Sequence, residues 1–122
     1  MINLLNKYYE GFEGEPELVL INEEDKNKMI IWNGYFEAIL DALLETDLER
    51  EGIIDDYFRH EGWYDDSPWK IKDIPLTIKQ LNRFDLDKVN QSENIKIVLP
   101  SLVEDIIEFL ASSSGNVLIE YD

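Results

Sequence analysis

Cysteine is absent from the 122-residue chain, and histidine occurs once, as His60. Without cysteine there is no disulfide framework, no thiolate nucleophile and no cysteine-ligated zinc site. His60-Glu61 also lacks the second histidine that a His-Glu-x-x-His zinc motif requires. We therefore expect His60 to be a surface or packing residue, and we expect a cytoplasmic protein because lack of cysteine is typical of a reducing compartment.

Glycine-rich phosphate loops and long hydrophobic runs are missing as well. The six glycines are scattered and form neither Gly-x-Gly-x-x-Gly nor a P-loop, so no nucleotide or other cofactor is expected. Unbroken apolar stretches such as Met29 to Trp32 are too short to cross a bilayer, and the N-terminus does not resemble a secretory signal. These features predict a soluble protein that does not bind membranes.

Basic residues are scarce, because 11 lysines and arginines stand against 27 acidic residues, for a net charge of −16. Such a field repels nucleic acid and anionic lipid and attracts cationic surfaces. Disorder would be one reading of so acidic a chain, but 44% hydrophobic and 11% aromatic residues favour a packed core. Alternatively, the negative charge serves only to keep the protein soluble and does not indicate a cationic partner.

The spacing of apolar residues predicts a single α+β domain over residues 1–122, helix-rich with a small sheet. The clearest helix runs from Trp32 to Leu44, with Asn33 as candidate N-cap, and a C-terminal helix is expected after a Ser101–Glu104 capping box. Residues 17–33 fit either strand or helix, although Val19 favours a strand. Further helices are predicted over residues 2–12, 48–58 and 74–84, strands over 70–74, 95–99 and 117–121, and a loop over 85–94.

An acidic ridge is predicted on the polar side of the helix that includes residues 33–44. Glu37, Asp41 and Glu45 follow one another at four-residue spacing, with no basic residue among them. Like charges at this spacing destabilise a helix by a few tenths of a kcal/mol per pair, so stability alone does not explain the ridge. The C-terminal helix repeats the pattern with Glu104 and Glu108, and we expect both faces to attract a cationic partner.

The Asp55 to Trp69 segment, which includes a predicted ordered loop over residues 59–69, is expected to contact the partner directly. Rigid aromatic rings combined with carboxylates suit a binding hot spot for lysine and arginine, since charges steer association while the rings supply buried area. Alternatively, Trp63 and Trp69 complete the core beneath the loop. The candidate contact residues are Asp55, Asp56, Glu61, Trp63, Tyr64, Asp65 and Asp66.

In size, acidity and lack of cysteine the chain resembles the small acidic immunity proteins of bacterial polymorphic-toxin systems, including contact-dependent growth inhibition. Two segments contribute to this resemblance. They are Trp32-Asn33-Gly34-Tyr35-Phe36-Glu37-Ala38-Ile39-Leu40 and Glu61-Gly62-Trp63-Tyr64-Asp65-Asp66-Ser67-Pro68-Trp69. The resemblance implies a cytoplasmic protein that binds one cognate toxin, often a basic RNase or DNase, and blocks its active site. We expect a monomer within such a complex.

Two other functions remain open at this point. An acidic nucleic-acid mimic or adaptor that inhibits a host or phage enzyme would carry the same charge. A small carboxylate-dependent hydrolase would use pairs such as Asp55-Asp56 or Asp65-Asp66, but adjacent acids arise often by chance in a chain with 27 of them. We therefore predict no enzyme, no catalytic residue and no metal ligand.

Overall fold

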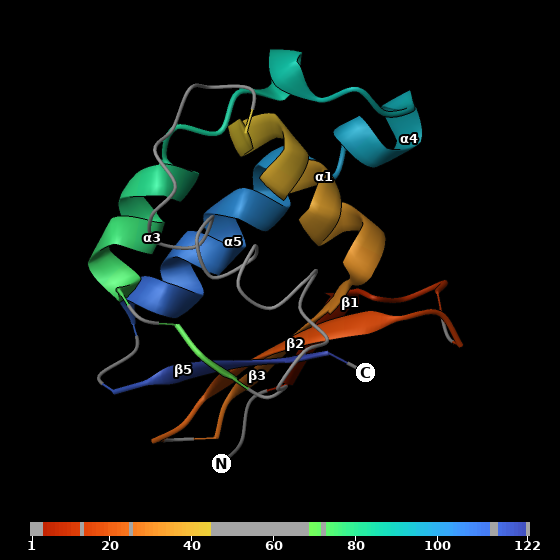
Figure 1. Ribbon diagram of the computed structural model, residues 1–122. Coiled ribbons are helices and arrows are strands. Elements are labelled where there is room, and N and C mark those ends of the chain that lie inside the picture. Colours follow the sequence, from red (N-terminus) through yellow and green to blue (C-terminus); the bar gives the residue numbers. More distant parts are fainter. Residues whose placement is uncertain are drawn as a thin grey trace.

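The computed structural model describes residues 4–12, 14–24, 26–44, 69–71, 73–112 and 115–121. These residues form one mixed sheet with the strand order β1-β3-β2-β5-β4 (Figure 1). Only β1 and β3 are parallel, and the other neighbours are antiparallel. The strands are β1 (Leu4–Tyr8), β2 (Glu17–Asn22), β3 (Lys28–Trp32), β4 (Trp69–Lys70) and β5 (Val117–Tyr121).

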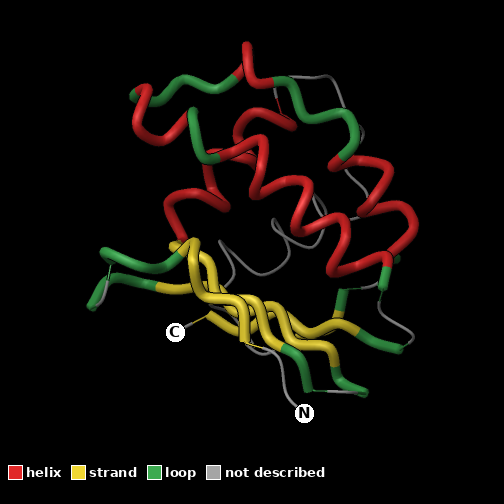
Figure 2. The backbone as a smooth tube through the Cα atoms, turned by 180° about the vertical axis from the view of Figure 1, so that it is seen from behind, coloured by secondary structure: helices red, strands yellow, loops and turns green. Residues whose placement is uncertain are grey.

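Helices lie together on one side of this sheet, as both views of the backbone show (Figures 1 and 2). More described residues lie in helices than in strands, and the predicted helix-rich α+β fold is confirmed. None of the described helices is long and apolar enough to span a membrane. The helices are α1 (Asn33–Leu44), α3 (Ile74–Leu81), the 3-10 helix η1 (Leu86–Lys88), α4 (Glu93–Lys96) and α5 (Leu99–Ala111).

The core lies between the sheet and the helices, because each contributes one apolar face. In β3, Met29 and Ile31 are buried while their neighbours are less so, which is the period of two expected of a strand with one covered face. Each fully buried aliphatic side chain stabilises the fold by about 1.5–3 kcal/mol relative to exposure. The largest such side chains are Leu18, Leu20, Met29, Ile31, Ile39, Leu40, Leu43, Leu99 and Leu102.

Several predicted elements are confirmed. The helix from 33 to 44 is α1, the short helix after residue 74 is α3, and the terminal strand is β5. The edge strand predicted over 70–74 is shorter and earlier, because β4 is Trp69–Lys70 and Asp73 already caps α3 by accepting a hydrogen bond from the Leu76 amide. Residues 17–33, for which the sequence fits either a strand or a helix, contain the antiparallel strands β2 and β3, and Asn33 begins α1.

The predicted N-terminal helix is wrong, because Leu4–Tyr8 is a strand that pairs with β3. The helical spacing of its apolar residues is overridden by hydrogen bonding to a strand more than 20 residues away. Gly11 and Gly14 then adopt positive φ angles of 91° and 95°, a conformation that glycine reaches without a steric penalty. They form a loop where the helix was expected to end.

The strand predicted over 95–99 is also wrong. Ile95 lies in α4, and α5 begins at Leu99, with Pro100 in its first turn, where no amide hydrogen is needed. Ser101 is therefore inside the helix, and the N-cap is Val98, which makes no side-chain capping bond. The loop predicted over 85–94 contains η1 and the start of α4.

Candidate functional site: a polar groove on α1

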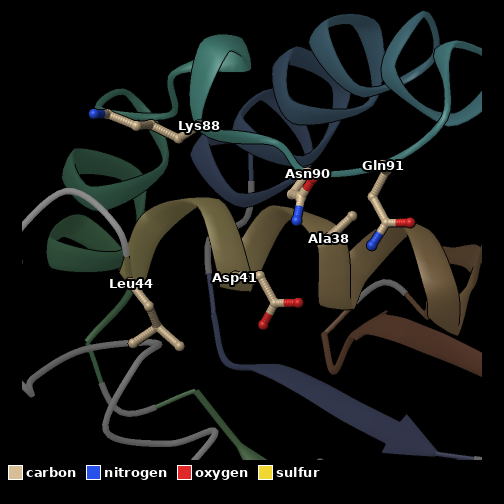
Figure 3. A pocket seen from close by; sticks show the side chains of 6 residues that line it. All are labelled: Ala38, Asp41, Leu44, Lys88, Asn90 and Gln91. Carbon is tan, nitrogen blue, oxygen red and sulfur yellow. The ribbon is translucent and has the colours of Figure 1, made fainter.

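A polar groove of about 320 Å³ separates α1 from Lys88 at the end of η1 and the residues that follow it (Figure 3). This volume is near the lower end of the roughly 300–1,000 Å³ that small-ligand pockets span. Residues three apart on a helix share one side, so α1 presents a continuous wall to the groove. The described lining residues are Ala38, Asp41 and Leu44 on α1, and Lys88, Asn90 and Gln91 on the opposite side.

Hydrogen bonds and one buried anchor hold the opposite wall in place. Asp85 caps η1, since its side chain accepts from the Asp87 amide at 3.0 Å and its carbonyl accepts from the Lys88 amide at 3.0 Å. Val89 is buried in the core cluster with only 7% of its surface exposed. The residues on either side of Val89 are therefore fixed along α1, although they are far from it in sequence.

The groove combines a small apolar part with several polar groups. Ala38 is buried, whereas Leu44 is 39% exposed and is one of two large hydrophobic side chains exposed among the described residues. Figure 3 shows the amide groups of Asn90 and Gln91 directed toward α1, while the ammonium end of Lys88 points away from Asp41. Among the described residues, those that line the groove therefore include one carboxylate and two amides beside the aliphatic side chains of Ala38 and Leu44.

Two of the three residues predicted as the acidic ridge are on adjacent turns of α1. Glu37 is half-buried and accepts a hydrogen bond from Asn33 Nδ2 at 3.2 Å, and Asp41 is exposed in the groove. Because Asn33 Oδ1 is buried and accepts no hydrogen bond, the prediction that Asn33 caps α1 is wrong. Glu45 lies outside the described residues.

The residues predicted as direct contacts in the Asp55 to Trp69 segment lie outside the described residues, and of that segment only Trp69, whose backbone lies in β4, is described. His60 is also outside the described part of the chain. The interface at this segment therefore stays a prediction. The residues concerned are Asp55, Asp56, Glu61, Trp63, Tyr64, Asp65 and Asp66.

The acidic side of α5 has a basic neighbour that the sequence did not reveal. Lys7 Nζ on β1 lies 3.2 Å from Asp105, and the Tyr8 hydroxyl donates a hydrogen bond to the same carboxylate. Burial, followed by this hydrogen bond and by the negative charges of Asp105 and Glu104, raises the pKa of Tyr8 well above its ordinary range. Glu104 and Glu108 remain exposed on the outer side of the helix.

An aromatic cluster orders the loop between β1 and β2, which projects from one end of the sheet (Figures 1 and 2). Phe12 stacks on Trp32 with ring centroids 4.2 Å apart, and Tyr35 meets both rings edge-on. Exposed Glu10 and Glu15 belong to the same loop. Aromatic rings and carboxylates thus occur together here as well, at a site that sequence reasoning assigned to a helix.

No group of three or more histidine, aspartate or glutamate side chains that could hold a metal ion is found among the described residues. Fold and surfaces together define an α+β protein with a mixed sheet covered by helices and with acidic side chains on several elements. Comparison with protein-family models, with curated proteins and with solved structures finds no match to this chain.

Proposed function

We propose that the protein is an immunity protein that binds a basic protein toxin, such as an RNase or DNase. Its carboxylates take the place of nucleic-acid phosphates in the substrate cleft of the toxin. The observation that carries the proposal is the net charge of −16 on a chain that nevertheless folds around an apolar core. No cofactor and no covalent step is required, because inhibition consists of occupying the cleft.

Exposed carboxylates on separate elements support this proposal. Asp41 on α1, Glu104 and Glu108 on α5, and Glu10 and Glu15 in the β1–β2 loop are all exposed. Residues 45–68 add nine acidic residues against two arginines. A field of one sign raises the rate of encounter with a cationic protein, and aromatic area at the contact then lengthens the life of the complex.

The proposal is tested with the gene directly upstream, which is expected to encode a large secreted protein with a basic C-terminal domain. That domain should stop bacterial growth when expressed alone and should be tolerated when this protein is co-expressed. The purified protein should also bind the domain and suppress its nuclease activity. Failure to bind or to restore growth would overturn the proposal.

Charge-reversal variants locate the contact. Asp65→Lys with Asp66→Lys should raise the dissociation rate at least about tenfold, equivalent to about 1.4 kcal/mol, because the segment is predicted to touch the toxin. Glu104→Lys with Glu108→Lys changes the net charge equally but should chiefly slow association. Circular dichroism confirms that both variants fold, and equal dissociation rates for both would place the interface elsewhere.

A further inference from the structure

We propose that two copies of the free protein join through the open face of the sheet to form a symmetric dimer. The open face is the side of the sheet opposite the helices, and no described helix covers it (Figures 1 and 2). Its apolar side chains require a cover, and its charges favour a second copy of this chain over a basic partner.

The three central strands have apolar residues on both of their faces. A sheet with one face in water usually alternates apolar and polar residues, whereas strands that are covered on both faces have continuous apolar runs. β2 contains such a run at residues 18–21, β3 at residues 29–32 and β5 at residues 117–119. Because the described helices cover only one face, these runs indicate a second covering layer.

Four side chains form an apolar patch on the open face. Successive residues of a strand point to opposite faces, so the residues next to the core positions face away from the helices. They are Val19, Ile21, Ile30 and Leu118, and none of these four described side chains belongs to the core cluster. Ile21 pairs with Leu118 on β5, and Val19 pairs with Ile30 on β3, so the four are contiguous.

Two lysines beside this patch restrict what can cover it. Lys28 of β3 pairs with Ile21, and Lys70 of β4 pairs with Leu118, so both lysines lie in one row with the patch. Both are exposed, and no ion pair joins either of them to a described carboxylate. The two ammonium groups repel a basic protein, whereas a second copy with a net charge of −16 attracts them.

A two-fold axis that is parallel to the interface and perpendicular to the strands makes the face self-complementary. The next row of the face contains Val19 paired with Glu120. Ile21 of one copy then lies over Val19 of the other, and Lys70 of one copy lies beside Glu120 of the other, twice by symmetry. Sheets packed face to face are about 10 Å apart, which lysine and glutamate side chains bridge together. The helices of both copies stay on the outside.

Sedimentation velocity of the full-length protein from about 10 µM to 1 mM tests the proposal. In about 0.5 M sodium chloride the protein should pass from monomer to dimer over this range, because salt screens the repulsion between two acidic copies. Ile21→Thr with Leu118→Thr keeps residues that suit a strand and should stay monomeric. The control Ile97→Thr removes an apolar side chain that is 78% exposed beside α4, and it should dimerise like the unchanged protein.

Charge variants test the contact between Lys70 and Glu120 at about 0.15 M sodium chloride. Lys70→Glu should weaken the dimer at least about threefold, and the double variant Lys70→Glu with Glu120→Lys should restore it, because the reversed pair forms again. Lys79→Glu on α3 changes the net charge in the same way as Lys70→Glu but lies on the helical side, so it should weaken the dimer less. Circular dichroism confirms that each variant folds.

A protein that stays monomeric at about 1 mM would overturn the proposal, and so would a dimer that Ile97→Thr disrupts as strongly as Ile21→Thr with Leu118→Thr. Equal effects of Lys70→Glu and Lys79→Glu without rescue by Glu120→Lys would also contradict it. If the upstream toxin domain instead shifts the methyl NMR signals of Ile21 and Leu118, the face belongs to the toxin and the dimer is wrong. Sedimentation of the free protein involves no toxin, so failure of the dimer leaves the proposed function unaffected.

Discussion

Tyr8 connects the edge strand β1 to α5 through a single hydroxyl group. The hydroxyl donates to Asp105, a residue 97 positions away, and the Lys7 ammonium lies 5.1 Å from the centroid of the Tyr8 ring. Because burial and the neighbouring carboxylates raise the pKa of the phenol above its ordinary value of about 10, the folded protein holds this proton more tightly than the unfolded chain.

Tyr8→Phe should therefore change both the stability and its dependence on pH. At pH 7 loss of the hydrogen bond to a charged group should lower the free energy of unfolding by about 1.5–3 kcal/mol. The stabilisation that arises from the raised pKa is fully present below about pH 10 and is lost as the pH rises further, so the variant should lose less stability on the alkaline side.

Urea unfolding from pH 7 to about 11 measures both effects. Tyr9→Phe is the matched control for removal of a hydroxyl, since the Tyr9 hydroxyl donates to the Glu15 carbonyl at 2.7 Å rather than to a carboxylate. If the alkaline slope of Tyr8→Phe equalled that of the unchanged protein, the Tyr8–Asp105 interaction would have no energetic significance.

At the scale of elements, the junction of β3 and α1 depends on close contact between Trp32 and Gly34. A Cβ atom at Gly34 would lie 2.4 Å from the indole ring of Trp32, well inside van der Waals contact. The same ring stacks on Phe12 and meets Tyr35 edge-on. Gly34 thus lets the first turn of α1 approach the aromatic cluster that orders the β1–β2 loop.

Gly34→Ala should destabilise the protein although alanine is the better helix former. Alanine gains about 1 kcal/mol of helix propensity over glycine, but overpacking against a rigid ring costs about 1–3 kcal/mol and displaces the indole. Urea unfolding should report the loss, and near-ultraviolet circular dichroism should report the movement of Trp32.

Gly115→Ala is the control, because a Cβ there would meet the end of the flexible Glu24 side chain at 3.0 Å. Its effect should stay below about 1 kcal/mol, with an unchanged aromatic spectrum. A more stable Gly34→Ala variant with the same spectrum as the unchanged protein would contradict this account of the junction.

The whole molecule is governed by a net charge of −16 around one apolar core. Charge of one sign attracts a cationic partner, but it also destabilises the compact state through self-repulsion. Salt reduces both effects, since the Debye length falls from about 30 Å at 0.01 M to about 10 Å at 0.1 M ionic strength.

Raising sodium chloride from about 0.01 to 0.5 M should therefore increase the midpoint of thermal unfolding, while it steeply lowers the rate of association with the proposed toxin domain. Calorimetry of the free protein and stopped-flow mixing of the two proteins measure the two trends. Glu104→Gln with Glu108→Gln removes two of the exposed charges and should make both salt dependences shallower. An association rate that is flat over this range would remove the electrostatic argument.

Local pattern was sufficient to predict the fold class and several elements. Apolar residues at three- and four-residue spacing identify α1, and the apolar run that begins at Val117 identifies β5, because both signals depend only on neighbours along the chain. Composition alone also established the acidic character. The predicted contact residues of α1, Glu37 and Asp41, are on the expected helix for the same reason.

Contacts between distant segments were decided only by the tertiary structure. Leu4–Tyr8 has helical spacing but is a strand, because β3 supplies its hydrogen-bond partners, and Ile95 has strand propensity but packs as part of α4 beside α5. The groove joins Asp41 to residues some 50 positions further on, whose placement depends on the burial of Val89. A short stretch of sequence does not include the distant segments that pack against it in the fold. Because the energy of a buried side chain depends on all the segments that surround it, such arrangements are not predicted from local sequence.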